Sequence, residues 1–141
     1  DLCDSGAVLI GAFTNRWTME LMKGLRYRFA LSGENPGVID TVGRREWALR
    51  GRTDDENSSE DYMIVTRLQQ ARTGRFLVAA AGLTQYGTEE TGRILASPEA
   101  LTSILSKLPA NWRTRNLQVV LHSEILGGSP ARPEVAAWWI W

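Results

Sequence analysis

The sequence of 141 residues has one cysteine, one histidine and no excess charge of either sign, because 16 Lys and Arg residues balance 16 Asp and Glu residues. The single cysteine, Cys3, excludes an internal disulfide and fits a reducing, cytoplasmic compartment. A neutral chain builds no extended positive field, so we expect neither direct nucleic-acid binding nor docking on a membrane. No apolar run approaches the ~20 residues that span a bilayer, and the first residues do not have the pattern of a signal peptide.

The composition is that of a globular protein, with 43% hydrophobic and 23% charged residues. The length is close to the commonest domain size, so we expect residues 1–141 to form a single α/β domain. Because the first residue is Asp1 rather than methionine, we expect the chain to be a fragment of a longer protein, with processing as the alternative.

The spacing of apolar residues predicts elements in the order β-α-β-β-β-β-α-α-β-β. A continuous apolar run at 7–13 predicts a strand buried on both faces. The stripe Trp17, Leu21, Leu25 and Phe29 predicts a helix of about four turns. Further strands are expected at 38–42, 46–49, 62–70, 75–81, 117–126 and 134–141.

Two more helices are expected, one at 88–96 and one that begins at Pro98 after the capping residue Ser97. The polar segment 51–61 has the composition of a mobile loop.

Strands 7–13 and 78–81 each lead into a helix, which is typical of parallel neighbours with a right-handed crossover. We therefore expect these two strands to pair in the middle of one mixed sheet of six or seven strands, with helices packed on it. Trp17 is expected to be mostly buried, where it would anchor the first helix on the sheet.

Two polar loops follow these strands, GAFTNRWT at 11–18 and GLTQYGT at 82–88. In an open α/β sheet, ligands bind beyond the carboxyl ends of parallel strands, and a helix start offers free N–H groups. The pattern predicts a ligand site at this edge. Its expected residues are Thr14, Asn15, Arg16, Thr84, Gly87 and Thr88.

The same residues also suit two helix starts, and neither loop is a Walker A or dinucleotide fingerprint. Glu89 and Glu90 would repel a phosphate near the second loop, so a ribose or an amide-bearing base fits better than a bare phosphate.

The sequence has little material for catalysis or metal binding. His122 lies in the strand 117–126 and is interpreted as a histidine on a sheet face, because no partner motif accompanies it. The acidic run 54–56 lacks the EF-hand pattern, so we expect no metal and no cofactor. Catalytic residues stay unassigned. The carboxylates available to an enzyme are Glu20, Glu89, Glu90 and Glu124.

Three of the six tryptophans lie at the end of the chain, at Trp138, Trp139 and Trp141. In a strand, Trp139 and Trp141 share one face, and Trp138 shares the other with Ile140. If one of these faces is exposed, it predicts an interface with a protein partner or a second copy of the chain. If helices cover both faces, the strand is internal.

Four segments carry a family resemblance: VLIGAFTNRWT at 8–18, DYMIVTR at 61–67, TGRFLVAAAGLTQYGT at 73–88 and LQVVLHSEILGG at 117–128. The chain resembles a domain found at the C-terminal end of uncharacterised acidobacterial proteins, where it follows a winged-helix or similar regulatory segment. The resemblance covers most of the chain. Since the family has no established activity, it implies only context, that of a module in a bacterial regulatory protein.

The expected function is therefore a non-catalytic sensory or protein-interaction domain of a bacterial regulatory protein, with a small ligand at the strand-end edge. The alternative is a nucleotide-processing enzyme similar in outline to TIR and nucleoside deoxyribosyltransferase domains. That enzyme would need a carboxylate near the edge, and Glu20 and Glu89 are the nearest in sequence. A third hypothesis is an oligomerisation domain that uses the tryptophan-rich end.

Overall fold

A computed structural model describes residues 6–32, 35–49, 59–69 and 74–141. Cys3 and the acidic run 54–56 lie outside the described residues. The elements are β1 (Ala7–Ile10), α1 (Arg16–Met22), β2 (Tyr27–Ser32), β3 (Asn35–Asp40), β4 (Glu46–Ala48), β5 (Glu60–Gln69), β6 (Phe76–Gly82), α2 (Gln85–Ala96), α3 (Pro98–Leu105), a 3₁₀ turn η1 (Ala110–Thr114), β7 (Leu117–Leu126), β8 (Ser129–Pro130) and β9 (Glu134–Ile140).

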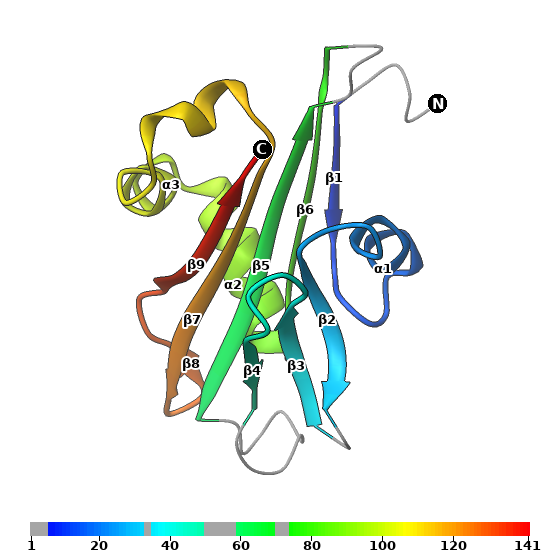
Figure 1. Ribbon diagram of the computed structural model, residues 1–141. Coiled ribbons are helices and arrows are strands. Elements are labelled where there is room, and N and C mark those ends of the chain that lie inside the picture. Colours follow the sequence, from blue (N-terminus) through cyan, green and yellow to red (C-terminus); the bar gives the residue numbers. More distant parts are fainter. Residues whose placement is uncertain (1–5, 33–34, 50–58, 70–73) are drawn as a thin grey trace.

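The main sheet is mixed and has six strands, which confirms the expected fold class. Its order is β1-β6-β5-β7-β8, and β9 pairs with β7. Strands β1 and β6 run parallel, whereas β6–β5, β5–β7 and β7–β9 are antiparallel. Strands β2, β3 and β4 form a separate antiparallel sheet, which crosses in front of the main sheet in Figure 1.

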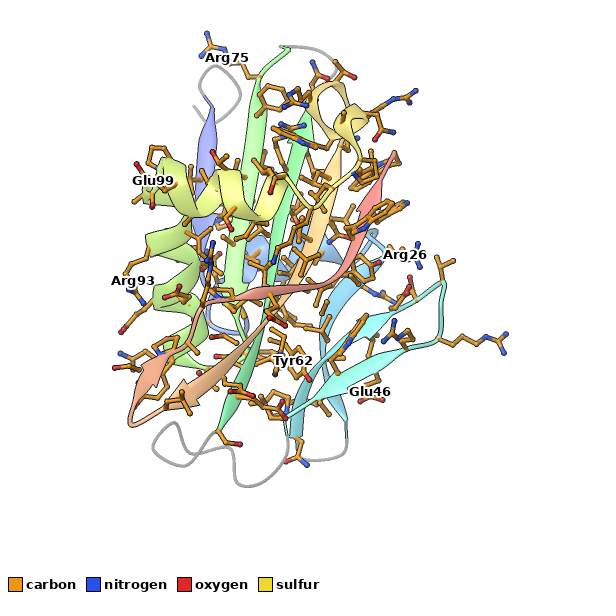
Figure 2. The ribbon with its side chains drawn as sticks, turned by 90° about the vertical axis from the view of Figure 1, so that its left-hand side faces the viewer. Arg26, Glu46, Tyr62, Arg75, Arg93 and Glu99 are labelled. Carbon is orange, nitrogen blue, oxygen red and sulfur yellow. The ribbon has the colours of Figure 1, made fainter. Side chains whose placement is uncertain are left out.

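Each face of the main sheet has its own core. The small sheet and α1 cover one face, around Tyr27, Ile64 and Val120. Helices α2 and α3 cover the other face, around Met63 and Leu121. Figure 2 shows this helical layer, with Arg93 and Glu99, on the opposite side of the main sheet from Glu46 of the small sheet. Both faces of β5 and β7 are therefore buried, which explains their long apolar stretches.

The predicted four-turn helix is wrong in its second half, because α1 ends at Met22 and Tyr27–Ser32 is a strand. Phe29 fits the helical spacing of Leu21 and Leu25, but it fits a period of two with Tyr27 equally well, and both aromatic residues are buried in β2. Pairing with β3 over six residues gives this segment backbone partners that a helix could not bring to the core.

The predicted burial of Trp17 is also wrong, since 70% of this residue is exposed. Helix α1 buries Thr18 and Met22 instead, so its buried stripe is rotated by one residue from the predicted one. A helix of seven residues can pack on a sheet through one pair of residues four positions apart, and in α1 this pair is Thr18 and Met22.

The pairing predicted for the first strand is confirmed, but its predicted central position and its predicted burial on both faces are wrong, because Val8 and Ile10 are exposed. β1 lies beside β6 in parallel register, with Val8 opposite Val78, while β6 has β5 on its other side. β1 itself ends at Ile10 and forms an edge of the sheet, because the hairpins β2–β4 build their own sheet rather than extend this one.

The predicted start of the second helix is wrong by three residues, because α2 begins at Gln85 and takes in Gly87 and Thr88. The loop predicted to end at Asp61 ends earlier, since β5 begins at Glu60 and Asp61 is buried within it. The rest of the loop, 51–58, lies outside the described residues. The start of α3 at Pro98 is confirmed, and the strands expected at 38–42 and 46–49 correspond to β3 and β4, which pair antiparallel.

Candidate functional site

The two loops that follow the parallel strands meet at one edge of the sheet, as predicted. They enclose a depression of about 350 Å³, which we call the strand-end depression. Its lining residues are Gly11, Ala12, Phe13, Thr14, Gly82, Leu83, Thr84, Gln85, Thr88 and Glu89. Because β1 and β6 run parallel, the carboxyl ends of both strands lie at this edge, and the depression lies where the ligand site was expected.

Of the three residues predicted from the first loop, Thr14 lines the depression and the other two do not. Asn15 caps α1: its Oδ1 accepts from the N–H groups of Trp17 and Thr18 at 3.1 and 3.3 Å. The amide nitrogen of Asn15 donates to the carbonyl of Ile10 at 3.0 Å. The polar groups of Asn15 are thus engaged in holding the turn between β1 and α1.

The second loop is organised by Asp61, which no pattern in the sequence singled out. Its carboxylate accepts hydrogen bonds from the backbone N–H groups of Leu83, Thr84 and Gly87, at 3.0, 3.1 and 2.8 Å. It also accepts a short hydrogen bond from the hydroxyl of Thr84. A carboxylate from β5 therefore fills the anion-binding position at the start of α2 that the sequence offered to a ligand.

Asp61 is buried, and this burial raises the pKa of its carboxyl above the ordinary value, while the hydrogen bonds from Thr84, Gly87 and Leu83 act in the opposite direction. No cation lies among its hydrogen-bond partners in the described residues. The carboxylate of Asp61 lies behind the depression, and its negative charge disfavours the binding of an anion in the depression.

The remaining predicted residues of the second loop also have internal partners. Thr88 accepts a hydrogen bond from the N–H of Gly82 at 3.2 Å and donates to its carbonyl at 3.4 Å. Gly87 lies against Asp61 and does not line the depression. The structure thus brings Thr14, Thr84 and Thr88 together at the depression but leaves Asn15, Arg16 and Gly87 outside its lining.

The four candidate carboxylates lie in different surroundings. Glu89 lines the depression and accepts from the side-chain amide of Gln85 at 2.8 Å. Glu20 forms an exposed ion pair with Lys23 on α1 at 2.6 Å. Glu90 is buried and pairs with Arg93, and Glu124 is exposed on β7. Glu89 is therefore the one of the four that could meet a ligand at this edge.

His122 has a partner that sequence analysis missed. Its Nε2 lies 3.0 Å from the Oε2 atom of Glu60, and its ring packs on Tyr62 with centroids 4.8 Å apart. All three side chains lie on the face of β5 and β7 toward the small sheet, because Tyr62 is directly opposite His122. Cross-strand register brings them together, and register cannot be read from a single sequence.

Trp138 and Trp139 lie on opposite faces of β9, as predicted, and Trp141 follows the strand on the side of Trp139. Trp139 and Trp141 stack with centroids 3.8 Å apart, and Trp138 is 41% exposed. An interface with a protein partner through these residues stays a prediction.

Within the described residues, no group of three or more His, Cys, Asp or Glu side chains could hold a metal ion. In the same part of the chain, no helix is both long and apolar enough to cross a membrane. Comparison with known proteins adds no further evidence, because no family model, curated protein or solved structure matches this chain.

Proposed function

We propose that this domain is a non-catalytic sensory module of a bacterial regulatory protein and that it binds a small uncharged polar ligand in the strand-end depression. The observation that carries the proposal is the convergence of the loops after β1 and β6 on one depression of about 350 Å³. That volume is within the range of small-molecule sites.

The lining favours an uncharged ligand. Among the described residues of the lining, Glu89 is the one charged side chain, and the carboxylate of Asp61 lies behind Thr84. Both repel phosphate, while the exposed ring of Phe13 and the hydroxyl of Thr14 offer an apolar surface and a hydrogen-bonding group. A nucleoside combines a flat base with ribose hydroxyls and carries no charge, so it suits this lining better than its phosphate ester does.

The test is titration calorimetry with nucleosides and their 5′-phosphates on the parent and on Thr14→Trp, in which the indole fills the depression. We expect a nucleoside to bind more tightly than its phosphate and Thr14→Trp to abolish binding. Thr114→Trp is the matched control, because Thr114 is exposed on η1, away from the depression. Equal binding by both variants, or no binding of any nucleoside, would disprove the ligand site.

A nucleotide-processing enzyme is the second candidate, and the position of Glu89 on the wall of the depression favours it. In that case Glu89 would act on a glycosidic bond, and incubation with nucleosides or NAD-like compounds would release free base. Chromatography of the products distinguishes the two functions, with Glu89→Gln as the inactive variant. Binding without base release supports the non-catalytic module.

A further inference from the structure

A second concave surface, which we call the basic groove, lies between the small sheet and the outer strand β9. Its volume is about 450 Å³. The residues that matter for its chemistry are Arg26, Tyr27, Arg45, Trp47, Lys107 and the segment Val135–Trp138. None of them lines the strand-end depression, so the two surfaces are distinct.

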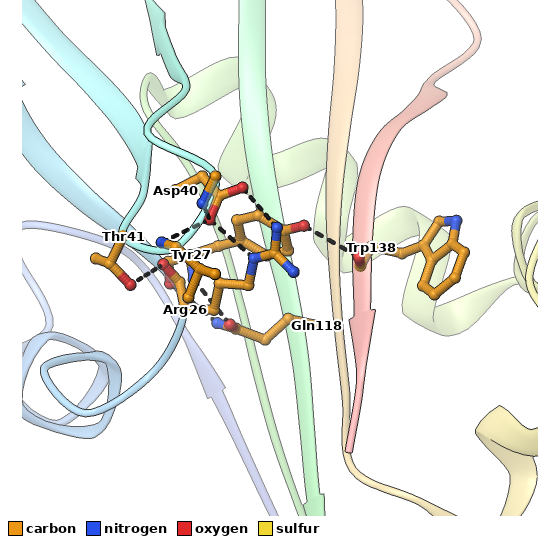
Figure 3. A network of polar contacts seen from close by, with 8 residues as sticks. Arg26, Tyr27, Asp40, Thr41, Gln118 and Trp138 are labelled. Atoms are coloured by element: carbon orange, nitrogen blue, oxygen red, sulfur yellow. Dashed lines mark hydrogen bonds and ion pairs between the residues drawn. The ribbon is translucent and has the colours of Figure 1, made fainter.

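Two cations of the basic groove have no ion-pair partner among the described residues. Asp40 is the acidic residue in the lining, and its carboxylate is already bound by Arg26 at 2.8 and 2.9 Å. Asp40 also accepts the N–H groups of Val42 and Gly43 at 3.0 and 2.9 Å. Figure 3 shows Arg26 and Asp40 joined in this way.

Arg45 and Lys107 therefore set the charge of the groove. Both are exposed, and neither forms an ion pair with a described residue. Arg45 comes from the loop between β3 and β4, whereas Lys107 follows α3, so the small sheet and the helical layer each supply one cation. The guanidinium of Arg45 lies over the ring of Trp47, 5.1 Å from its centroid, which orients it at the groove.

The floor of the groove is the open edge of β9. Asn116 and Trp141 exchange both of their backbone hydrogen bonds. Since hydrogen-bonded pairs alternate along an antiparallel ladder, the backbone N–H and C=O groups of Trp139 and Ala137 also point toward β7, whereas those of Trp138 point away from it. The hydroxyl of Tyr27 donates to the carbonyl of Trp138 at 3.0 Å from this side, as Figure 3 shows. Tyr27 thus blocks the pairing of an added peptide strand, which favours a small molecule.

The groove also offers flat apolar surface. Trp47 is half-buried in the groove, and its ring meets the buried ring of Tyr27 edge to face with centroids 6.1 Å apart. Ala136 and Ala137 of β9 add small side chains to the floor. An aromatic ring can lie against such a surface with its charged groups at the rim, where cations of both walls can reach them.

We propose that the basic groove binds a small aromatic dianion, with its negative groups held by Arg45 and Lys107 and its ring against Trp47 and the alanines of β9. The negative groups can be two carboxylates or one phosphate ester, since both present oxygen acceptors to a guanidinium and an ammonium group.

The test uses phthalate, phenyl phosphate, inorganic phosphate and uncharged benzyl alcohol as probes. Binding is followed by the shift of the indole N–H signal of Trp47 in two-dimensional NMR spectra, assigned with Trp47→Phe. We expect at least one aromatic dianion to bind more tightly than inorganic phosphate and benzyl alcohol, and its identity distinguishes carboxylate from phosphate. Arg45→Gln and Lys107→Gln should each weaken that binding about tenfold, the contribution of one charge-assisted contact.

Arg44→Gln is the matched control, because Arg44 is an exposed cation in the same loop but does not line the groove. It should change the dissociation constant by less than about twofold at physiological salt. Arg45→Lys, which keeps the charge, should retain most of the binding. Thr14→Trp should leave binding in the basic groove unchanged, so a failure of the strand-end depression to bind its ligand can be distinguished from a failure of the groove.

Three results would overturn the proposal. The first is that neither aromatic dianion shifts the Trp47 signal at about 5 mM, a concentration that detects even millimolar affinity. The second is equal weakening by Arg44→Gln and Arg45→Gln, and the third is equal affinity for inorganic phosphate and both aromatic dianions.

Discussion

Helix α2 contains two glycines whose replacement by alanine should change stability in opposite directions. Gly92 has open space where a methyl group would be added, with no other atom within 4 Å. Alanine there should stabilise the protein by about 0.5–1 kcal/mol, because glycine loses more backbone entropy in a helix. At Gly87 the same methyl group would lie 2.4 Å from the Oδ2 atom of Asp61 and 2.6 Å from its Cγ atom.

The magnitude at Gly87 follows from what holds the carboxylate of Asp61. To make room, Asp61 must move away from the N–H groups of Gly87, Thr84 and Leu83, which it binds at 2.8, 3.1 and 3.0 Å. The loss of two buried hydrogen bonds costs about 1–3 kcal/mol each, from which the gain in helix propensity is subtracted. We expect Gly87→Ala to lower the free energy of unfolding by about 2–4 kcal/mol.

Urea denaturation followed by tryptophan fluorescence measures both variants, with Gly92→Ala as the matched control. At about 3 °C per kcal/mol for a domain of this size, the melting temperature of Gly87→Ala should fall by about 6–12 °C. If both variants stabilise the protein, the carboxylate of Asp61 does not hold the start of α2, and it does not disfavour an anionic ligand in the strand-end depression.

Two further predictions concern the docking of the small sheet. Gln118→Leu should lower the free energy of unfolding by about 2–4 kcal/mol, because the buried N–H and C=O groups of Tyr27 lose their side-chain partners at 2.9 and 3.0 Å. Urea denaturation measures this loss beside the exposed control Gln69→Leu, and a loss below about 0.5 kcal/mol would contradict the prediction. Arg26 holds the pKa of Asp40 at about 2, below its ordinary value of 3.8. Ionised Asp40 therefore contributes about 2 kcal/mol to the free energy of unfolding, which is present above about pH 4 and is lost as the pH falls toward 2. Asp40→Asn should therefore be less stable at pH 7 and lose less stability between about pH 4 and 2, and parallel acid-denaturation curves for the two proteins would refute the linkage.

The first helix shows where a sequence pattern admits two readings. Leu21, Leu25 and Phe29 are spaced as on a helix, but Tyr27 and Phe29 are also spaced as on a strand. The decision depends on β3, which pairs with Tyr27–Ser32 across a hairpin. Propensity and periodicity describe a segment by itself, whereas its partner strand supplies the hydrogen bonds that decide its conformation.

The candidate sites differ in how far sequence reaches them. The strand-end depression was predictable, because apolar strands that run into helices favour parallel pairing and bring their loops together. Asp61 was not, since its role depends on β5 lying beside β6, which presents its carboxylate to the start of α2. The basic groove was also hidden, because Arg45 and Lys107 are far apart in the chain and line one groove only in the folded structure.

By itself, the sequence determined the α/β class, the parallel pair at the depression and six of the longer elements, namely β5, β6, α2, α3, β7 and β9. Each of these depends on local periodicity and on residues that start or end an element. Tertiary structure alone decided that β2–β4 form a second sheet, that β1 is an edge and that Trp17 faces outward. It also decided that Asp61, rather than a ligand, occupies the start of α2. Each of these outcomes depends on which distant segment supplies a hydrogen-bond partner or covers an apolar face, and one segment's own residues do not specify that choice.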